Sequence, residues 1–349
     1  MIQLRIISFL GIFLVLSYNT YSQETIQVDP VITQQFASPL IEGISGSMNS
    51  GWFQRAPKSQ FLGFEMELTF IGMGTFLDSD QKLFNSNSRV KFPESTIDKM
   101  VEGMDSRIKG LVKDSLMNST FQVNISGPTA IGSSAESVQI NYPGDTISVN
   151  YMGEERKVIV PGVNVDSKVK GINMPVAPMG TLQLSLGTLA GTKLSLRFTP
   201  PVFLGKEIGS ITNYGIGIHH NLMVWFTKKP AVDVSMAFYM QKLSIGEVFK
   251  STSIQYGLFV SKTLGSSSIN VTPFTGLTLE KNNSNIRYNY NYTDNYGNSG
   301  ELQIAMDLNS GSLFRFRTGA SLKLSVVNLT LTYGYSSHHS LSAGFGLIF

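Results

Sequence analysis

Cysteine is absent from the 349 residues of this chain. Its absence excludes disulfides, thiolate metal sites, thiol nucleophiles and the lipid-bearing cysteine of a bacterial lipoprotein. Charged side chains are also scarce, since Asp, Glu, Lys and Arg make up 15% of the residues and leave a formal net charge of +3. The chain has no long basic run, so its charge gives no support to nucleic-acid binding.

The chain also lacks an apolar run long enough to cross a membrane as a helix. Residues 6–16 are apolar apart from Ser8, but a spanning helix needs about 20 apolar residues. This run follows Arg5 and precedes the small residues Thr20 and Ser22, an order typical of a secretory signal peptide. We expect removal of residues 1–22; a buried amino-terminal strand is the alternative. An integral mature protein without a spanning helix must be a β-barrel.

Alternating apolar and polar side chains are abundant, most clearly in residues 313–349. Because successive side chains of a strand point to opposite faces, each segment there has one apolar and one polar face. A barrel that turns its apolar face to lipid and its polar face to a lumen has this pattern. The chain ends on the apolar Phe345, Leu347 and Phe349, which we expect to act as a signal for the barrel-assembly machinery.

A first strand in residues 40–53 is the least regular of the predicted strands. Leu40, Ile44 and Met48 share one parity there, whereas Gly46 weakens a strand. After the signal peptide, we expect residues 23–77 to hold a polar lead-in followed by the first barrel strands.

The main barrel is expected in residues 179–349. We count about eleven to thirteen segments in the whole chain, and because bacterial barrels use even numbers, we predict 12–14 strands. Residues 282–298, together with 301–308, are expected to form a long β-hairpin that reaches beyond the membrane. The aromatic residues expected at the membrane interfaces are Trp52, Trp225 and Phe226.

Residues 78–178 interrupt the alternation and predict one amphipathic helix, residues 97–116. Its apolar residues recur at steps of three and four: Ile97, Met100, Val101, Met104, Ile108, Leu111 and Val112. Two interpretations stay open, a plug or lid in the barrel mouth and a helix of a small accessory domain. The predicted fold class is therefore all-β, a transmembrane antiparallel β-barrel with an inserted segment that contains one amphipathic helix.

Histidine is the first residue type to consider for catalysis. The four histidines are two adjacent pairs: His219 with His220, and His338 with His339. Neighbours on a regular strand point to opposite faces, so neither pair can chelate one metal with both rings. The chain also lacks the G-x-S-x-G, H-E-x-x-H and Walker motifs. We expect no enzyme activity, no catalytic residue, no cofactor and no metal, with a membrane-embedded hydrolase open as a third hypothesis.

Charged residues on the polar parity form the candidate site. The predicted lumen-lining residues are Glu65, Glu67, Lys193, Arg197, Asp233, Arg315, Arg317 and Lys323. Two carboxylates on one strand are costly in an apolar core, whereas a wet lumen hydrates them. These charges either pair with one another and fill the lumen, or form a constriction that selects solutes.

Four short motifs carry a resemblance to a known family. They are Asn49-Ser50-Gly51-Trp52-Phe53, Leu62-Gly63-Phe64, Tyr214-Gly215-Ile216-Gly217-Ile218-His219-His220 and Gly344-Phe345-Gly346. Over most of the mature chain except 78–178, the sequence resembles a family of uncharacterised outer-membrane barrels from Bacteroidota. That family is distantly similar to barrels of the long-chain fatty-acid transporter type, which hold a plug in the lumen. The resemblance implies passage of small hydrophobic molecules, with no ligand residue to carry over.

The expected function is therefore that of a channel or transporter for small solutes in the outer membrane of a Gram-negative bacterium. The expected partners are the lipid bilayer, the barrel-assembly machinery and a small hydrophobic solute, with no nucleic acid. A structural or surface-interaction barrel without conduction is the alternative.

Overall fold

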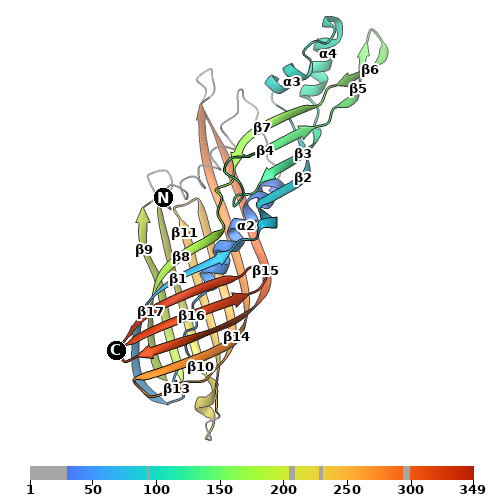
Figure 1. Cartoon of the computed structure of the whole chain (residues 1–349). Helices are drawn as coiled ribbons and strands as arrows, with labels where there is room; N and C mark the ends of the chain where they lie inside the picture. The colour runs from blue at the N-terminus through green and yellow to red at the C-terminus, as the bar shows by residue number, and fades with distance from the viewer. Residues whose placement is uncertain (1–29, 93, 204–208, 228–230, 294–298) are drawn as a thin grey trace. The chain divides into compact units, whose positions relative to one another are not determined.

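The computed structural model describes residues 30–92, 94–203, 209–227, 231–293 and 299–349 (Figure 1). The predicted signal peptide, residues 1–22, lies outside the described residues. The chain divides into two compact units. The barrel unit comprises Leu40–Asp78, Pro175–Arg287 and Asp307–Phe349, and the second unit comprises Met1–Pro39, Ser79–Met174 and Tyr288–Met306.

Among the described residues, ten long strands close into an antiparallel barrel. They are β1 (Leu62–Phe76), β8 (Val176–Leu189), β9 (Thr192–Phe203), β10 (Ser210–Asn221), β11 (Asp233–Ile245), β12 (Phe249–Ser261), β14 (Ile269–Thr293), β15 (Ser299–Leu324), β16 (Val327–Tyr335) and β17 (Ser340–Ile348). They follow the order β12-β11-β10-β9-β8-β1-β17-β16-β15-β14, and β14 pairs back onto β12. The two-residue β13 (Leu264–Gly265) pairs with β14. The predicted barrel is confirmed.

The number of strands is ten instead of the predicted twelve to fourteen for two reasons. Residues 282–293 and 301–308 do not form extra strands but continue β14 and β15. The segment from Leu40, predicted as a strand, is helical and belongs to α2 (Pro30–Asn49). The side chains of Tyr288, Tyr290 and Tyr292 lie outside the described part of the chain.

Burial divides each barrel strand into two faces. Inward side chains are polar and buried, as in Gln183, Ser253 and Thr278, each of which is 1% exposed. Outward side chains are apolar and open, as in Leu258 and Phe345, both 52% exposed. These outward apolar side chains, called the apolar belt, would be costly to expose to water but favourable in contact with lipid. The apolar belt therefore suits a barrel that spans a bilayer.

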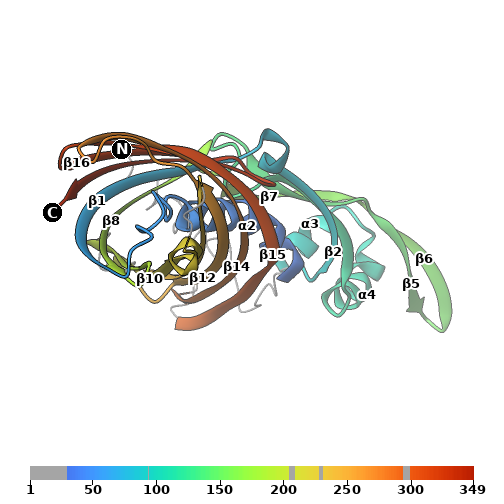
Figure 2. The ribbon, with the colours of Figure 1, turned by 90° about the horizontal axis from the view of Figure 1, so that it is seen from below.

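The helix α2 replaces the predicted first strand because its sequence satisfies both periods. Leu40, Ile44 and Met48 are spaced by four residues, which keeps one parity for a strand and one face for a helix. From Leu40 onward α2 runs inside the ring of strands (Figure 2). A Cβ atom at Gly46 would lie 2.7 Å from Oγ1 of Thr75, so glycine permits the close approach of helix and wall. Within the described residues, no helix is both long and apolar enough to cross a bilayer.

The second unit contains the residues predicted as one amphipathic helix. They form two helices, α3 (Glu94–Met100) and α4 (Ser106–Met117), separated at Gly103, which has a positive φ of 81°. Ile97 and Val112 are fully buried. The remaining elements of this unit are η1 (Ser79–Lys82), a sheet of β2 (Leu83–Val90), β3 (Phe121–Pro128), β4 (Ser137–Tyr142) and β7 (Val163–Lys170), and a hairpin of β5 (Asp145–Tyr151) and β6 (Glu154–Val160). Both helices belong to this unit. The prediction of one continuous helix over 97–116 is wrong, because the chain turns between Met100 and Ser106.

Because α2 packs closely against the barrel strands, adding one methyl group at Gly46 should have a measurable effect. Replacing Gly46 by alanine should lower the free energy of unfolding by about 1–3 kcal/mol, because Thr75 is fully buried and bonded to Ser47. Glycine to alanine in a helix otherwise stabilises by about 0.5–1 kcal/mol. The measurement is urea unfolding followed by the intrinsic fluorescence of the two tryptophans, Trp52 and Trp225. Gly110→Ala in α4, where a Cβ meets no atom within 4 Å, is the control and should not destabilise the barrel.

Candidate functional site

Residues 40–61, called the lumen segment, run through the interior of the barrel unit. Near the carboxyl end of β1, the Ser47 hydroxyl donates to the Ala177 carbonyl at 2.6 Å and contacts the Thr75 hydroxyl at 3.0 Å. Near the start of β1, the Phe61 carbonyl accepts from the Ala190 N–H at 2.7 Å. The chain thus enters the lumen at the Phe76 end of β1, crosses it, and returns along the wall as β1.

Aromatic rings hold the middle of the lumen segment. Trp52 stacks on Tyr239 with ring centroids 4.8 Å apart, and Phe53 stacks on Phe259 at 4.1 Å. Gly217 of β10 makes room for these rings, because a Cβ there would lie 2.5 Å from Tyr239. Each such pair adds about 0.5–1.5 kcal/mol beyond the area that it buries. The predicted position of Trp52 at a membrane interface is therefore wrong, since its side chain is inside the barrel and 4% exposed.

Two arginines bind the carboxyl end of α2. Arg197 donates from Nη1 to the Met48 carbonyl at 3.3 Å, and Arg317 donates from Nη2 to the Asn49 carbonyl at 2.9 Å. The last carbonyls of a helix have no partner within it and carry the negative end of its dipole. A guanidinium group donates hydrogen bonds to these carbonyls, and its positive charge offsets the negative end of the dipole. Arg197 also lies over the Trp52 ring, with Cζ 3.8 Å from the centroid.

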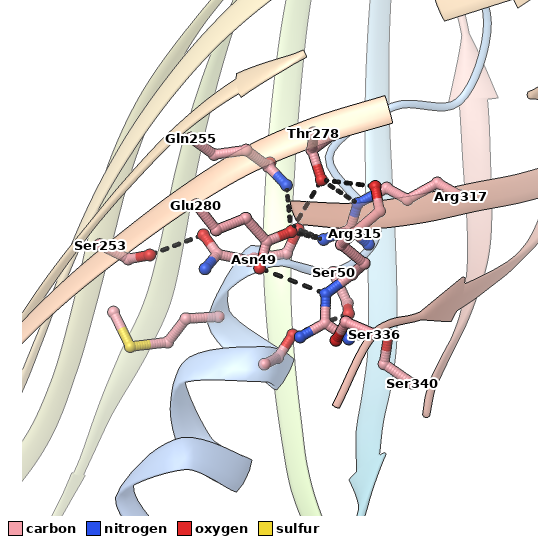
Figure 3. Close-up of polar contacts among 12 residues, drawn as sticks. Asn49, Ser50, Ser253, Gln255, Thr278, Glu280, Arg315, Arg317, Ser336 and Ser340 are labelled. Carbon is pink, nitrogen blue, oxygen red and sulfur yellow. Dashed lines mark hydrogen bonds and ion pairs between the residues drawn. The ribbon is translucent and has the colours of Figure 1, made fainter. Parts of the chain in front are cut away.

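Glu280 neutralises part of this buried positive charge (Figure 3). Its carboxylate lies 2.6 Å from Nη2 of Arg317 and 3.2 Å from Nε of Arg315. Gln255 and Thr278 also donate to it, both at 2.9 Å. All four bonds reach a carboxylate that is 4% exposed. Two cations share one anion here, so the group keeps a net positive charge against the helix end.

A second charged group lies nearer the start of β1. Arg55 of the lumen segment approaches Glu65 at 2.6 Å and Glu67 at 3.1 Å. Lys58 also pairs with Glu65, at 3.0 Å, and the Lys193 ammonium donates to the Arg55 carbonyl at 3.1 Å. The two carboxylates on one strand are therefore matched by cations that the lumen segment carries.

Six of the eight predicted lumen-lining residues fall into two groups of three, and the other two lie apart. Glu65, Glu67 and Lys193 gather around Arg55, and Arg197, Arg315 and Arg317 gather around the end of α2 and Glu280. Asp233 accepts a hydrogen bond from Asn221 at 2.8 Å, apart from both groups. Lys323 is only partly buried, near the end of β15.

The predicted set of lumen-lining charges omitted two partners of these residues, Arg55 and Glu280, although the alternation had placed Glu280 on the inward face. Glu280 has the parity of an inward residue on β14, and an inward pair of arginines needs an acid, so a signal for it existed. Arg55 lies in the irregular part of the lumen segment, where no periodicity assigns a direction.

The histidines are dispersed. His219 is buried and bonded to Ser235 at 2.9 Å, whereas His220 accepts from Trp225 at 2.9 Å. In the β16–β17 connection, His338 lies between Glu42 of α2, at 3.0 Å, and Asp78, at 3.4 Å. The two carboxylates approach different ring nitrogens, so the three groups do not converge on one ion. In the described residues, no group of three or more potential ligands could hold a metal.

Glu280 provides a test of the buried charges. Glu280→Gln keeps the shape but leaves two buried guanidinium groups without their anion, so we expect the free energy of unfolding to fall by about 3–5 kcal/mol. The matched control is Asp307→Asn, which breaks the exposed 2.7 Å pair with Arg287 and should cost about 0–1 kcal/mol. Urea unfolding of both variants measures the difference. Equal losses in the two variants would show that the buried group does not hold the lumen segment.

His338 provides a pH dependence. The hydrogen bond that the His338 imidazole donates to the Glu42 carboxylate raises the pKa of His338 above its usual value, against the effect of burial, and Asp78 adds to the rise. A raised folded-state pKa stabilises the fold fully below the ordinary imidazole pKa, and this stabilisation is lost as the pH rises through the raised pKa. We expect the coupling between His338→Gln and Glu42→Gln in a double-mutant cycle to be present near about pH 6 and absent near about pH 9. A coupling that does not change between these pH values would refute it.

Several solved outer-membrane barrels resemble the chain weakly. The N-terminal β-barrel domain of Pseudomonas aeruginosa OprF is 13% identical, over 45% of this chain and 94% of that chain, with a TM-score of 0.21. The translocator domain of the autotransporter NalP from Neisseria meningitidis is 10% identical, over 92% and 96%, with a TM-score of 0.22. A loop L8 deletion mutant of OmpT from Vibrio cholerae is 7% identical, over 82% and 98%, with a TM-score of 0.23.

Scores this low carry no argument, so the barrel architecture rests on the strand pairing of this chain itself. No protein with a curated description matches the chain. The match that extends over the whole chain, residues 1–349, is to a Family of unknown function (DUF6588), and the protein belongs to that family.

Proposed function

We propose that the protein is an outer-membrane barrel sealed by its own lumen segment, which anchors the second unit on the outer side of the membrane. The observation that carries the proposal is the occupied lumen. Residues 40–61 fill it with stacked rings and with carbonyls bound by buried arginines. This is the structural or surface-interaction barrel that stood as the alternative to a channel.

Opening the lumen would separate groups that are costly to expose or to leave unpaired. Arg197 and Arg317 would lose the helix carbonyls that accept their hydrogen bonds. Arg317 would keep its ion pair with Glu280, whereas Arg197 would keep only the neutral side chains of Gln183 and Gln241, and a buried cation without an anion is costly. Trp52 and Phe53 would leave Tyr239 and Phe259. A permanently open path through the barrel is therefore not supported.

The lengths of the connections support the orientation. Residues 77–175 join β1 to β8 at the Phe76 end of β1. At the other end the β8–β9 and β15–β16 connections have two residues each, the β12–β14 connection has seven and the β10–β11 connection has eleven, so all are far shorter. Outer-membrane barrels have short periplasmic turns and long outer loops. The second unit would accordingly emerge on the outer side, and the carboxyl terminus would face the periplasm.

The proposed partners are the lipid bilayer and the barrel-assembly machinery. The bilayer would contact the outward apolar residues, and the machinery would recognise Phe345, Leu347 and Phe349 on the exposed face of the last strand. Neither role involves catalysis or a cofactor.

A gated transporter is the second candidate, favoured by the contact at the entrance of the lumen. His338 holds Glu42 of α2 there, and both Glu42 and Asp78 have side chains that are 47% exposed, so solvent and pH reach the contact. In this case residues 40–61 would move to admit a small solute. The resemblance to Bacteroidota barrels and to long-chain fatty-acid transporters would make that solute hydrophobic.

A reversible lock on the lumen segment separates the two candidates. Because the chain has no cysteine, Ser47→Cys with Thr75→Cys can form a single disulfide between α2 and β1. A sealed anchor should show no steady conductance and no uptake of a labelled fatty acid into liposomes, whether the pair is oxidised or reduced. A gated transporter should show uptake in the wild type that oxidation of the pair abolishes and reduction restores. Uptake by the wild type would therefore contradict the sealed anchor, with Ser47→Cys alone as the control.

A further inference from the structure

A hollow lined mostly by polar residues lies on the outside of the barrel, at the end where β1 passes into the inserted residues. Its volume is about 870 Å³, and it lies over β10, β11, β12 and the neighbouring part of β14. The side chains that matter in its lining are Tyr214, Lys242, Ser244, Lys250, Thr252 and Asn285. Because inward residues of these strands alternate with them, these six belong to the outer face.

The strand register brings the two lysines close to hydroxyl and amide groups. Lys242 pairs across the sheet with Tyr214 and with Thr252. Lys250 pairs with Ser244 and with Asn285. Directly opposite residues on one face of a sheet lie about 5 Å apart at their Cβ atoms, so the ammonium groups, hydroxyls and amide can reach one ligand.

The hollow begins where the apolar belt ends. On β12, Thr252 is followed on the same face by Ile254, Tyr256 and Leu258, and the last two are 55% and 52% exposed. On β11, Lys242 is preceded on that face by Met240. One ligand can therefore place a polar group in the hollow and an apolar tail against the neighbouring outward apolar residues.

The charge of the hollow is positive. Lys242 makes no ion pair with any described residue, and Lys250 lies 2.5 Å from Glu247, whose carboxylate is 92% exposed. Two ammonium groups thus share one carboxylate that solvent already screens. Lysines at the edge of a lipid-facing surface cost little there, and they attract anionic headgroups.

We infer that this hollow binds the phosphorylated headgroup of an outer-leaflet lipid, whose acyl chains lie on the apolar belt below it. Ammonium groups bind phosphate as point charges, and hydroxyl and amide groups complete its hydrogen bonds. A free phosphate would use the same donors but would gain nothing from the apolar belt. The inference rests on the proposed orientation of the barrel in the outer membrane. Because the hollow lies on the exterior, the inference does not depend on whether the lumen is sealed.

The test compares lipids that differ only in phosphate. Full-length protein in detergent is titrated with diphosphorylated lipid A, with dephosphorylated lipid A and with inorganic phosphate, and bound lipid is measured by native mass spectrometry. We expect the wild type to bind the diphosphorylated lipid most tightly. Lys242→Gln and Lys250→Gln should each weaken this binding about fivefold, and the double variant about 25-fold.

Lys262→Gln is the matched control, because Lys262 is an exposed lysine just beyond the other end of β12 and should leave binding unchanged. Heat-modifiable migration on a gel verifies that each variant is folded. Equal binding by the wild type and the double variant would overturn the inference, as would equal binding of the two lipids. Competition by inorganic phosphate at the same concentration as the lipid would assign the hollow to free phosphate instead, and the comparison of ligands on the wild type alone decides this even if a variant fails to fold.

Discussion

Two backbone carbonyls at the end of α2 are the constraint on which the interior of the barrel depends. A helix that ends inside a protein leaves its last carbonyls without partners, and water is excluded from this position. Arg197 of β9 and Arg317 of β15 supply the missing donors from distant parts of the wall. Each arginine is then a buried charge that needs its own environment. Trp52 faces Arg197, and Glu280 lies against Arg317, so the helix end, the rings and the acid form one connected arrangement.

The same arrangement explains why the lumen is filled by a segment that precedes the barrel. The lumen segment carries the groups that match the wall at three levels: small residues beside Thr75, aromatic rings at mid-height, and Arg55 beside Glu65 and Glu67. A polar wall without this segment would be a hydrated channel with unpaired charges. With the segment in place, the charges of the wall become internal contacts. This favours a sealed anchor, and it restricts any transport to states in which the segment moves.

Prediction from the sequence succeeded where a pattern depends on one strand alone. Alternation along β10 and β17 assigned the inward and outward faces because a strand in a closed barrel has lipid on one side and the lumen on the other. It failed for Leu40, Ile44 and Met48, whose spacing suits a helix as well as a strand. Strand number was also overestimated, since one long strand such as β14 holds both a membrane part and an extension beyond it.

The sequence by itself determined the class of fold and the two faces of its wall, because side-chain alternation is a local property that needs no knowledge of distant residues. It also indicated that charges such as Arg315 and Arg317 face inward. Only the tertiary structure decided what those charges meet. Glu280 lies 35 residues before Arg315, and Asn49 lies 268 residues before Arg317. Contacts at such separations depend on how the strands close and on which segment enters the lumen, and neither leaves a periodic signal in the sequence.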